Sequence, residues 1–229
     1  MNGFGVFKLV FRKRNNYAIN IFPHGYNSTM KPIFVGIAGG SGSGKSTLGF
    51  GLMDMFPNDI GLLQLDDYQR KREELSMVDG LPNWDDPAAI NFTRLLEDIN
   101  ALEKGETINV QTKSERFNPE YKEKGRISFM IAPKRIMLLE GYLALWDKHV
   151  RSKLHSSIFL DLPDELRVRR RTKFIDPVYI EKILLPMHHQ YIEPTKQYAT
   201  HIIEVGGKSK EKVLYEAKEF LVDLGIISP

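Results

Sequence analysis

The chain has 229 residues, of which 42% are hydrophobic and 27% are charged, and this composition is typical of one globular α/β domain. It contains no cysteine, which excludes disulfide bonds, thiolate catalysis and cysteine-ligated zinc. No stretch approaches the ~20 consecutive apolar residues of a membrane span. We therefore expect a cytoplasmic protein without a membrane partner.

The net charge of +3 comes from one end of the chain. The first 29 residues hold four basic residues and no acid: Lys8, Arg12, Lys13 and Arg14. The rest is nearly neutral, and we therefore expect no nucleic-acid partner. Residues 1–29 are interpreted as an N-terminal extension. It is a targeting peptide, an accessory strand or, as we favour, upstream sequence with Met30 as the real start. Residues 30–229 are expected to form the folded domain.

Apolar runs alternate with segments of helical periodicity from residue 33 onward. Continuously apolar runs predict strands near 33–38, 60–65, 134–140, 156–161 and 201–205. Helices are predicted near 45–56, 87–104, 163–173, 177–191 and 209–224. This alternation favours a doubly wound parallel sheet with helices on both faces, in which ligands bind beyond the carboxyl ends of the strands.

A glycine-rich loop follows the first predicted strand. Its residues Gly39-Gly40-Ser41-Gly42-Ser43-Gly44-Lys45-Ser46-Thr47 fit the pattern G-x-x-x-x-G-K-[ST] of a phosphate-binding P-loop. Backbone N–H groups and the following helix would hold the β-phosphate, while Lys45 reaches the β- and γ-phosphates and Ser46 binds Mg²⁺. A flexible Gly/Ser linker would not explain Lys-Ser at this offset. The loop predicts ATP and Mg²⁺ as cofactors without naming the phosphoryl acceptor.

Two carboxylates follow the second predicted strand, in Asp66-Asp67-Tyr68. A hydroxyl acceptor must lose its proton as the P–O bond forms, and a carboxylate near the γ-phosphate can take it and also order Mg²⁺ through water. We predict Asp66 as this base and metal residue, and Asp67 as a support of the loop. The alternative is a pair of capping aspartates in a turn.

Glu140 ends the third strand, after Leu138-Leu139 and before Gly141. An acid at this place matches the Walker B role of orienting Mg²⁺ or its waters. The alternative is a solvated strand end.

An arginine-rich helix is predicted after the fourth strand, in Arg167-Val168-Arg169-Arg170-Arg171. Arg167, Arg170 and Arg171 share one helix face, and this face could stabilise the transferred phosphoryl group as a lid. The alternative is a solvated basic surface.

Together these residues resemble the uridine kinase/phosphoribulokinase-like family of P-loop kinases, which includes nicotinamide riboside kinase-like members. The resemblance covers about residues 32–222. It rests on the P-loop, Gln64–Tyr68, Asn83–Ala89, Leu139–Tyr142, the arginine helix and Tyr191–Ala199.

The resemblance implies roles for residues at matching positions. Asp66 falls at the catalytic base, and Asp85 where an aspartate accepts hydrogen bonds from ribose hydroxyls. Arg171 falls on the sugar side of the substrate, while Arg167 and Arg170 would serve the phosphates. Tyr68 and Trp84 are added as candidate acceptor-binding residues, and Gly207-Lys208 lies near the family's adenine cradle.

In uridine kinases an aromatic residue and a histidine recognise the pyrimidine base, and this sequence has other residues at the two matching positions. Asn109 and Ser114 stand there, and Phe117 or Tyr121 are candidates to replace them. The predicted lid is also short, as in the nicotinamide riboside kinase side of the family.

Our first hypothesis is therefore an ATP-dependent kinase acting on the 5′-hydroxyl of a ribonucleoside, most simply of the uridine or cytidine type. The alternatives are a kinase for nicotinamide riboside, pantothenate or a sugar phosphate, and a non-catalytic nucleotide-binding switch. The expected partner is a small molecule, and a homo-oligomer stays open.

Overall fold

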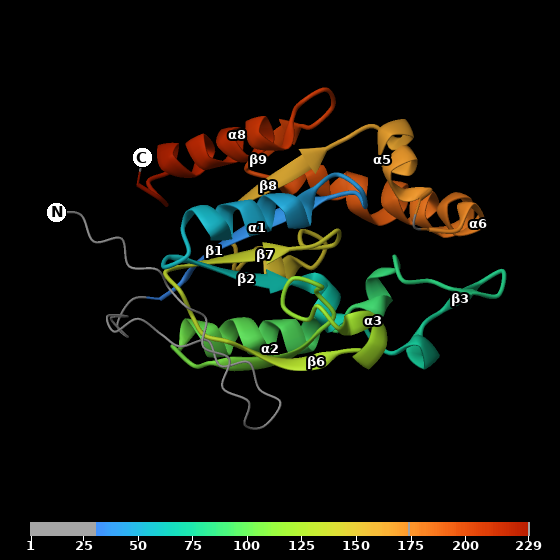
Figure 1. Ribbon diagram of the computed structural model, residues 1–229, viewed down its shortest axis with the longest axis horizontal. Helices are drawn as coiled ribbons and strands as arrows, with labels where there is room; N and C mark the ends of the chain where they lie inside the picture. Colours follow the sequence, from blue (N-terminus) through green and yellow to red (C-terminus); the bar gives the residue numbers. More distant parts are fainter. Residues whose placement is uncertain (1–30, 174, 229) are drawn as a thin grey trace.

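A five-stranded parallel sheet forms the centre of the computed structural model, which describes residues 31–173 and 175–228 (Figure 1). The strand order is β2-β7-β1-β8-β9, and every neighbouring pair is parallel. The strands are β1 (Ile33–Gly39), β2 (Ile60–Gln64), β7 (Ile136–Glu140), β8 (Ser156–Asp161) and β9 (His201–Glu204). The five predicted strands and the doubly wound α/β class are thus confirmed. The expectations for residues 1–29 lie outside the described residues.

The two faces of the sheet are covered by different elements. Apolar side chains of α1 (Lys45–Met55) and α8 (Lys210–Asp223) pack on one face, next to Val35 and Ile37 of β1. The opposite face, which carries Phe34 and Ala38, is covered by α2 (Phe92–Glu103) and by the antiparallel pair β5 (Ile108–Thr112) and β6 (Ile127–Ile131). Because both faces of β1, β2 and β7 are buried, these three strands are almost continuously apolar.

The predicted helix over 87–104 is wrong in its first turn. A short 3₁₀ turn covers Pro87–Ala89, and α2 begins only at Phe92. Two side chains act as separate caps, since Asp86 accepts a hydrogen bond from the Ala88 N–H and Asn91 accepts one from the Arg94 N–H. The chain between the two caps is extended at Ile90, which forms a bridge with Gln69. Because two capping residues lie within one segment, this segment forms a 3₁₀ turn and a separate helix instead of one continuous helix.

The predicted helix over 177–191 is helical but not regular. It begins as α6 (Pro177–Tyr179), passes through α7 (Leu185–Met187) and ends in a 3₁₀ segment over Glu193–Tyr198. Wide π-type turns lie on both sides of α7, over Ile180–Leu184 and His188–Ile192. Pro186 in α7 has no N–H to donate and its ring displaces the preceding turn, which accounts for this interruption.

Two hairpins beside the central sheet were not predicted. One is the β5–β6 pair, and the other is the short pair β3 (Met77–Val78) and β4 (Leu81–Pro82). Figure 1 shows β3 projecting from the edge of the molecule at which the parallel strands end, on the same side as α5 (Asp164–Arg171) and α6. Two further short helices are α3 (Tyr121–Lys124) and α4 (Lys148–Arg151). No helix within the described residues is long and apolar enough to cross a membrane.

Candidate active site

The glycine-rich loop connects β1 to α1 at the carboxyl edge of the sheet. Gly42 has a φ of 88° and Gly44 a φ of 105°, left-handed values that favour glycine. The Ser43 N–H donates to the Gly40 carbonyl at 3.1 Å and closes the turn. Within the described part of the chain, no side chain caps the N-terminus of α1, and its first turn holds no acid. The free N–H groups and the positive end of α1 therefore suit an anion such as a phosphate.

Lys45 is buried and folds back over this loop. Its ammonium donates to the Gly40 carbonyl at 3.1 Å, and 7% of the residue is exposed. Burial lowers the pKa of Lys45, while the neighbouring carboxylates of Glu140 and Asp66 oppose that shift. A buried cation that faces two carboxylates beside the loop is well suited to bind phosphate oxygens.

Glu140 ends β7 directly beside β1. The parallel register pairs Ile37 with Glu140, so that the carboxylate emerges next to the start of the loop. Glu140 is 6% exposed and accepts a hydrogen bond from the Gln64 amide at 3.4 Å. Burial raises the pKa of Glu140, and Lys45, Gln64 and Ser46 oppose the shift. A hydroxyl and one carboxylate beside a phosphate site fit Mg²⁺, which takes its remaining ligands from phosphates and water.

Two arginines of α5, Arg167 and Arg170, contact the glycine loop in different ways. Arg167 is 1% exposed, forms an ion pair with Asp164, and donates to the Ser41 carbonyl at 3.4 Å. A Cβ atom on Gly40 would lie 2.7 Å from the Arg167 guanidinium, so the two are closely packed. Arg170 is exposed and donates to the Gly42 carbonyl at 3.0 Å. These contacts place Arg167 against the loop backbone, whereas the sequence analysis expected it on the phosphates.

Three buried polar atoms near the loop have no hydrogen-bond partner among the described residues. They are the Ser43 hydroxyl and the Nε atoms of Arg167 and Arg171. Buried polar groups normally have partners. Together with the uncapped helix end, these atoms indicate that the loop region fits a ligand rich in oxygen acceptors, such as a nucleoside triphosphate.

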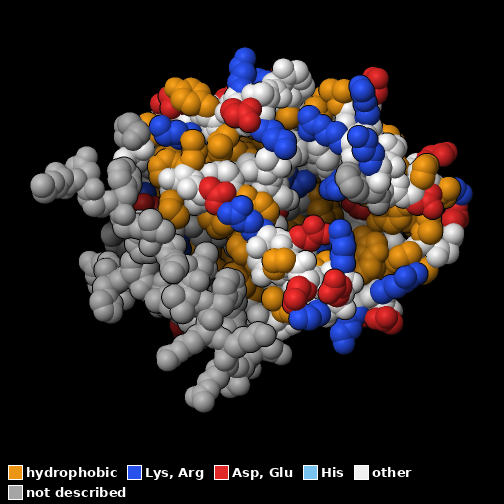
Figure 2. Space-filling model, in the orientation of Figure 1, with side chains coloured by type: hydrophobic (Ala, Val, Ile, Leu, Met, Phe, Trp, Pro, Cys, Tyr) orange, Lys and Arg blue, Asp and Glu red, His pale blue; other side chains and the backbone are white. Residues whose placement is uncertain are grey.

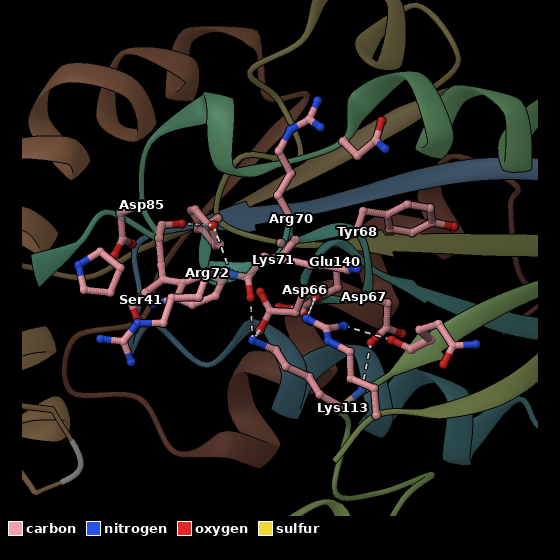
Figure 3. A pocket seen from close by; sticks show the side chains of 18 of the residues that line it. Ser41, Asp66, Asp67, Tyr68, Arg70, Lys71, Arg72, Asp85, Lys113 and Glu140 are labelled. Atoms are coloured by element: carbon pink, nitrogen blue, oxygen red, sulfur yellow. Dashed lines mark hydrogen bonds and ion pairs between the residues drawn. The ribbon is translucent and has the colours of Figure 1, made fainter. Parts of the chain in front are cut away.

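Asp66 and Asp67 follow β2 in a single 3₁₀ turn but face different neighbours. The Asp66 carboxylate reaches Lys113 at 3.3 Å and is partly exposed to the cavity (Figure 3). The Asp67 carboxylate accepts the backbone N–H of Lys113 at 3.2 Å. Burial raises the pKa of Asp67 to about 6. Asp67 thus attaches the turn to the β5–β6 hairpin, while Asp66 remains accessible to a ligand.

Asp85 lies opposite Asp66 on the loop after β4, and it is 8% exposed. The Tyr179 hydroxyl, from α6, donates to the Asp85 carboxylate at 2.8 Å and accepts the Trp84 N–H at 3.1 Å. The Tyr142 hydroxyl donates to the Trp84 carbonyl at 2.6 Å. The segment that carries Asp85 is therefore fixed from two other elements.

One cavity of about 1280 Å³ is lined by nine of the nineteen predicted site residues. Figure 2 shows basic and acidic side chains gathered around this hollow on the visible face. Its volume exceeds that of a site for one small ligand, and it therefore has room for a nucleotide and an acceptor together. The predicted residues that line it are Ser41, Lys45, Ser46, Asp66, Tyr68, Trp84, Asp85, Glu140 and Arg171.

Some predicted residues lie outside the cavity lining. Gly207 and Lys208 follow β9 at the same edge of the sheet, and the Lys208 ammonium pairs with Glu216 at 2.5 Å. Phe117 stacks on Phe129 with ring centroids 4.7 Å apart, which removes it as a replacement for a base-reading aromatic. Tyr121 does line the cavity.

Tyr68 borders the cavity, but its hydroxyl is already hydrogen-bonded within the protein. This hydroxyl donates to Asp98 at 3.0 Å, and Tyr68 is only 4% exposed. Its contacts are thus mainly with the core beneath α2.

Sequence reasoning missed Lys113, Gln69, Tyr142 and Tyr179 as site residues. Lys113 and Tyr179 come from the β5–β6 hairpin and α6, far along the chain from the motifs that they contact. Gln69 directly follows Asp66–Tyr68, and Tyr142 directly follows Glu140-Gly141. Their position just after two strand ends could have indicated them as site residues.

Comparison with known proteins shows the family of this chain. Residues 34–211 match the model of the phosphoribulokinase/uridine kinase family. The chain belongs to this family. Relatives include proteins named uridine kinase from Clostridium novyi, 35% identical with 79% of this chain and 91% of the relative covered, and from Streptococcus gordonii, 32% identical with 82% and 98% covered.

Solved structures share the fold of this family member at lower identity. A protein described as a possible uridine kinase from Bacillus stearothermophilus has a TM-score of 0.56 at 16% identity, covering 77% of this chain and 90% of the other. A gluconokinase from Sinorhizobium meliloti has a TM-score of 0.50 at 16% identity, with 85% and 94% covered.

The buried carboxyl group of Asp85 predicts a pH-dependent stability. Burial raises the pKa of Asp85 to about 6, against 3.8 for an unperturbed aspartate. At pH values between these two pKa values, Asp85 is protonated in the folded protein but ionised in the unfolded chain. The free energy of unfolding therefore falls as pH rises from about 4 to 6. Asp85→Asn should therefore be more stable than the wild type at pH 7.5, by up to about 3 kcal/mol.

Urea unfolding of both proteins at pH 4 and pH 7.5 measures this effect. The difference between the variant and the wild type should nearly vanish at pH 4. A variant whose free energy of unfolding follows that of the wild type at both pH values would contradict the buried-carboxyl account.

Proposed function

We propose that the protein is an ATP-dependent kinase that transfers the γ-phosphate to the 5′-hydroxyl of a ribonucleoside of the uridine type. The observation that carries this proposal is the single cavity in which the P-loop lysine, Glu140, Asp66 and Asp85 face one another. The relatives named uridine kinase, matched over most of their length, support the acceptor class.

The proposed reaction is an in-line transfer. The acceptor oxygen bonds to the γ-phosphorus, the bond from this phosphorus to the β–γ bridging oxygen breaks, and ADP leaves. Asp66 takes the proton of the acceptor hydroxyl, because its partly exposed carboxylate faces the same cavity as Lys45. Lys45 and Arg170 neutralise the charge on the phosphates, and Arg171 binds on the acceptor side. Catalysis is then mostly positioning and charge stabilisation.

The glycine loop and the metal residues have separate proposed tasks. The loop from Gly39 to Thr47 holds the triphosphate, and Gly207-Lys208 lies on the adenine side. Ser46, Glu140 and, through water, Asp66 would hold Mg²⁺, which would neutralise charge on the phosphates. Arg167 supports the loop backbone, an assignment that follows from its burial against Gly40 and Ser41.

Asp85 is the proposed ligand of the ribose hydroxyls. Its two carboxylate oxygens suit a vicinal diol, and Trp84 and Tyr68 border the same space. Neither Asn109 nor Ser114 can stack on a base, while the aromatic side chains of Trp84 and Tyr179 line the cavity. This observation favours nicotinamide riboside as a second candidate acceptor.

The cytoplasmic location, the lack of nucleic-acid and membrane partners, the domain boundary at residue 30 and the oligomeric state stay predictions.

The assignment of the base predicts unequal effects within the aspartate pair. Asp66→Asn should reduce turnover by about 10²–10⁴-fold with little change in ATP binding, because the general base is lost. Asp67→Asn should reduce turnover much less, because an amide oxygen can still accept the Lys113 N–H. Steady-state kinetics with uridine and binding of a non-hydrolysable ATP analogue measure both effects. The reverse order of the two variants would sink the assignment of Asp66.

The ribose assignment predicts discrimination against 2′-deoxynucleosides. A site built to bind a hydroxyl rejects analogues that lack it, since its own polar groups then stay unpaired. The wild type should therefore prefer uridine and cytidine to their deoxy forms, measured as kcat/KM, and Asp85→Ala should reduce this preference.

An acceptor panel that includes nicotinamide riboside tests the same assignment. An unchanged ribose preference in Asp85→Ala would remove Asp85 from sugar binding. A wild type that phosphorylates only acceptors without ribose would refute the nucleoside kinase proposal.

A further inference from the structure

Lys113 at the end of the β5–β6 hairpin is the cation in direct contact with the candidate base. Its ammonium lies 3.3 Å from the Asp66 carboxylate and donates to the Gln69 side-chain carbonyl at 2.7 Å (Figure 3). Lys113 directly follows Thr112, the last residue of β5. Asp66 follows β2 and Lys113 follows β5, and these two strands are in different sheets. Their contact therefore joins two separate parts of the fold.

Further bonds hold the backbone of the same junction. The Lys113 N–H donates to the Asp67 carboxylate, and Arg126 donates to the Asp66 carbonyl at 3.1 Å and to the Gln111 carbonyl at 2.8 Å. Arg126 and Asp67 thus fix the backbones of the turn and the hairpin to each other. The side chain of Lys113 takes no part in these backbone bonds and instead holds the Asp66 carboxylate and the Gln69 side chain.

A chain of hydrogen bonds continues from Lys113 to the candidate acceptor residue. Gln69 accepts from Lys113 and donates to the Tyr142 hydroxyl at 3.3 Å. Tyr142 in turn donates to the carbonyl of Trp84, the neighbour of Asp85. The carboxylate that would take the proton and the one that would bind the sugar are therefore connected through side chains that also line the cavity.

The charges around Asp66 explain why its carboxylate needs a partner. Asp67 on the same turn, Asp85 on the loop after β4 and Glu140 on β7 all repel it, as shown by its effect on their pKa values. Lys45 on α1 is a second nearby cation, but it faces Glu140 and the phosphate loop as well. Arg126 donates to the backbone carbonyl of Asp66. A triphosphate would draw Lys45 further toward itself. Lys113 would then be the cation that keeps Asp66 in place.

We propose that Lys113 is a positioning residue for the phosphoryl transfer, acting through Asp66 by fixing its carboxylate and aligning it with the acceptor bound at Asp85. This inference rests on the proposed function, because it takes Asp66 as the base. It assigns the β5–β6 hairpin a second task besides lining the acceptor side of the cavity. The connection also explains why Lys113 contacts Gln69 and Asp66 together.

The variant Lys113→Met tests the proposal, since methionine keeps much of the length but removes the charge. The fold should persist, because the Lys113–Asp66 pair is partly exposed and such pairs contribute little stability. We expect kcat for uridine to fall about 10- to 100-fold, with ATP-analogue binding and the melting temperature close to those of the wild type. Lys113→Arg, which keeps the cation, should restore most of the lost turnover.

Lys122→Met is the matched control. Lys122 lies in the same connection between β5 and β6 and pairs with Glu115 at 3.1 Å, but both side chains are exposed and neither lines the large cavity. Its turnover should equal that of the wild type. A Lys113→Met enzyme within twofold of this control would overturn the proposal.

A double-mutant cycle with Asp66→Asn shows whether Lys113 acts through Asp66. If it does, adding Lys113→Met to Asp66→Asn should cause little further loss, because the carboxylate to be positioned is already gone. A full additional loss would overturn the positioning role and indicate direct contact with substrate. A nearly fully active Asp66→Asn enzyme would instead refute the proposed base. Failure of the proposed function is thereby distinguished from failure of this inference.

Discussion

The burial of Lys45 opposite Glu140 is the constraint on which the rest of the site depends. Desolvation disfavours both charges, lowering the pKa of Lys45 and raising that of Glu140, and each group opposes the shift of the other. Two buried charges of opposite sign tolerate each other only with further polar partners. Here these are the Gly40 carbonyl for Lys45 and the Gln64 amide for Glu140. A site with such partners is electrostatically prepared for an anion and a cation together.

The parallel sheet brings the segments that carry these groups together at one edge. β7 lies between β2 and β1, so the carboxyl ends of three neighbouring strands meet at one place. Those ends lead to Asp66, Glu140 and the glycine loop. The order of the strands therefore fixes which side chains become neighbours, while the loops adjust their final distances. This arrangement follows the general rule for ligand sites in open α/β sheets.

The sequence predicted the phosphate end of the site far better than the acceptor end. The loop, Asp66 and Glu140 each adjoin an apolar strand, and local pattern alone reveals a strand end. Lys113 and Tyr179 have no such signal, because they reach the cavity through long-range packing of a hairpin and an irregular helix. The same limit explains the misplaced start of α2, where two adjacent caps interrupt an otherwise helical pattern. It also explains Arg167, whose burial depends on the close approach of α5 to Gly40.

The glycine loop and the β3–β4 hairpin should differ in how readily the chain around them opens. The glycine loop extends from β1, the central strand, which is hydrogen-bonded on both sides and buried on both faces. The β3–β4 pair has only two residues in each strand, and these are exposed or half-buried. Segments with few buried contacts open at lower free energy than the core. Backbone amides around β1 should thus exchange hydrogen slowest, while those of the β3–β4 hairpin exchange quickly. The hairpin can therefore open for an acceptor while the strand that carries the glycine loop stays in place.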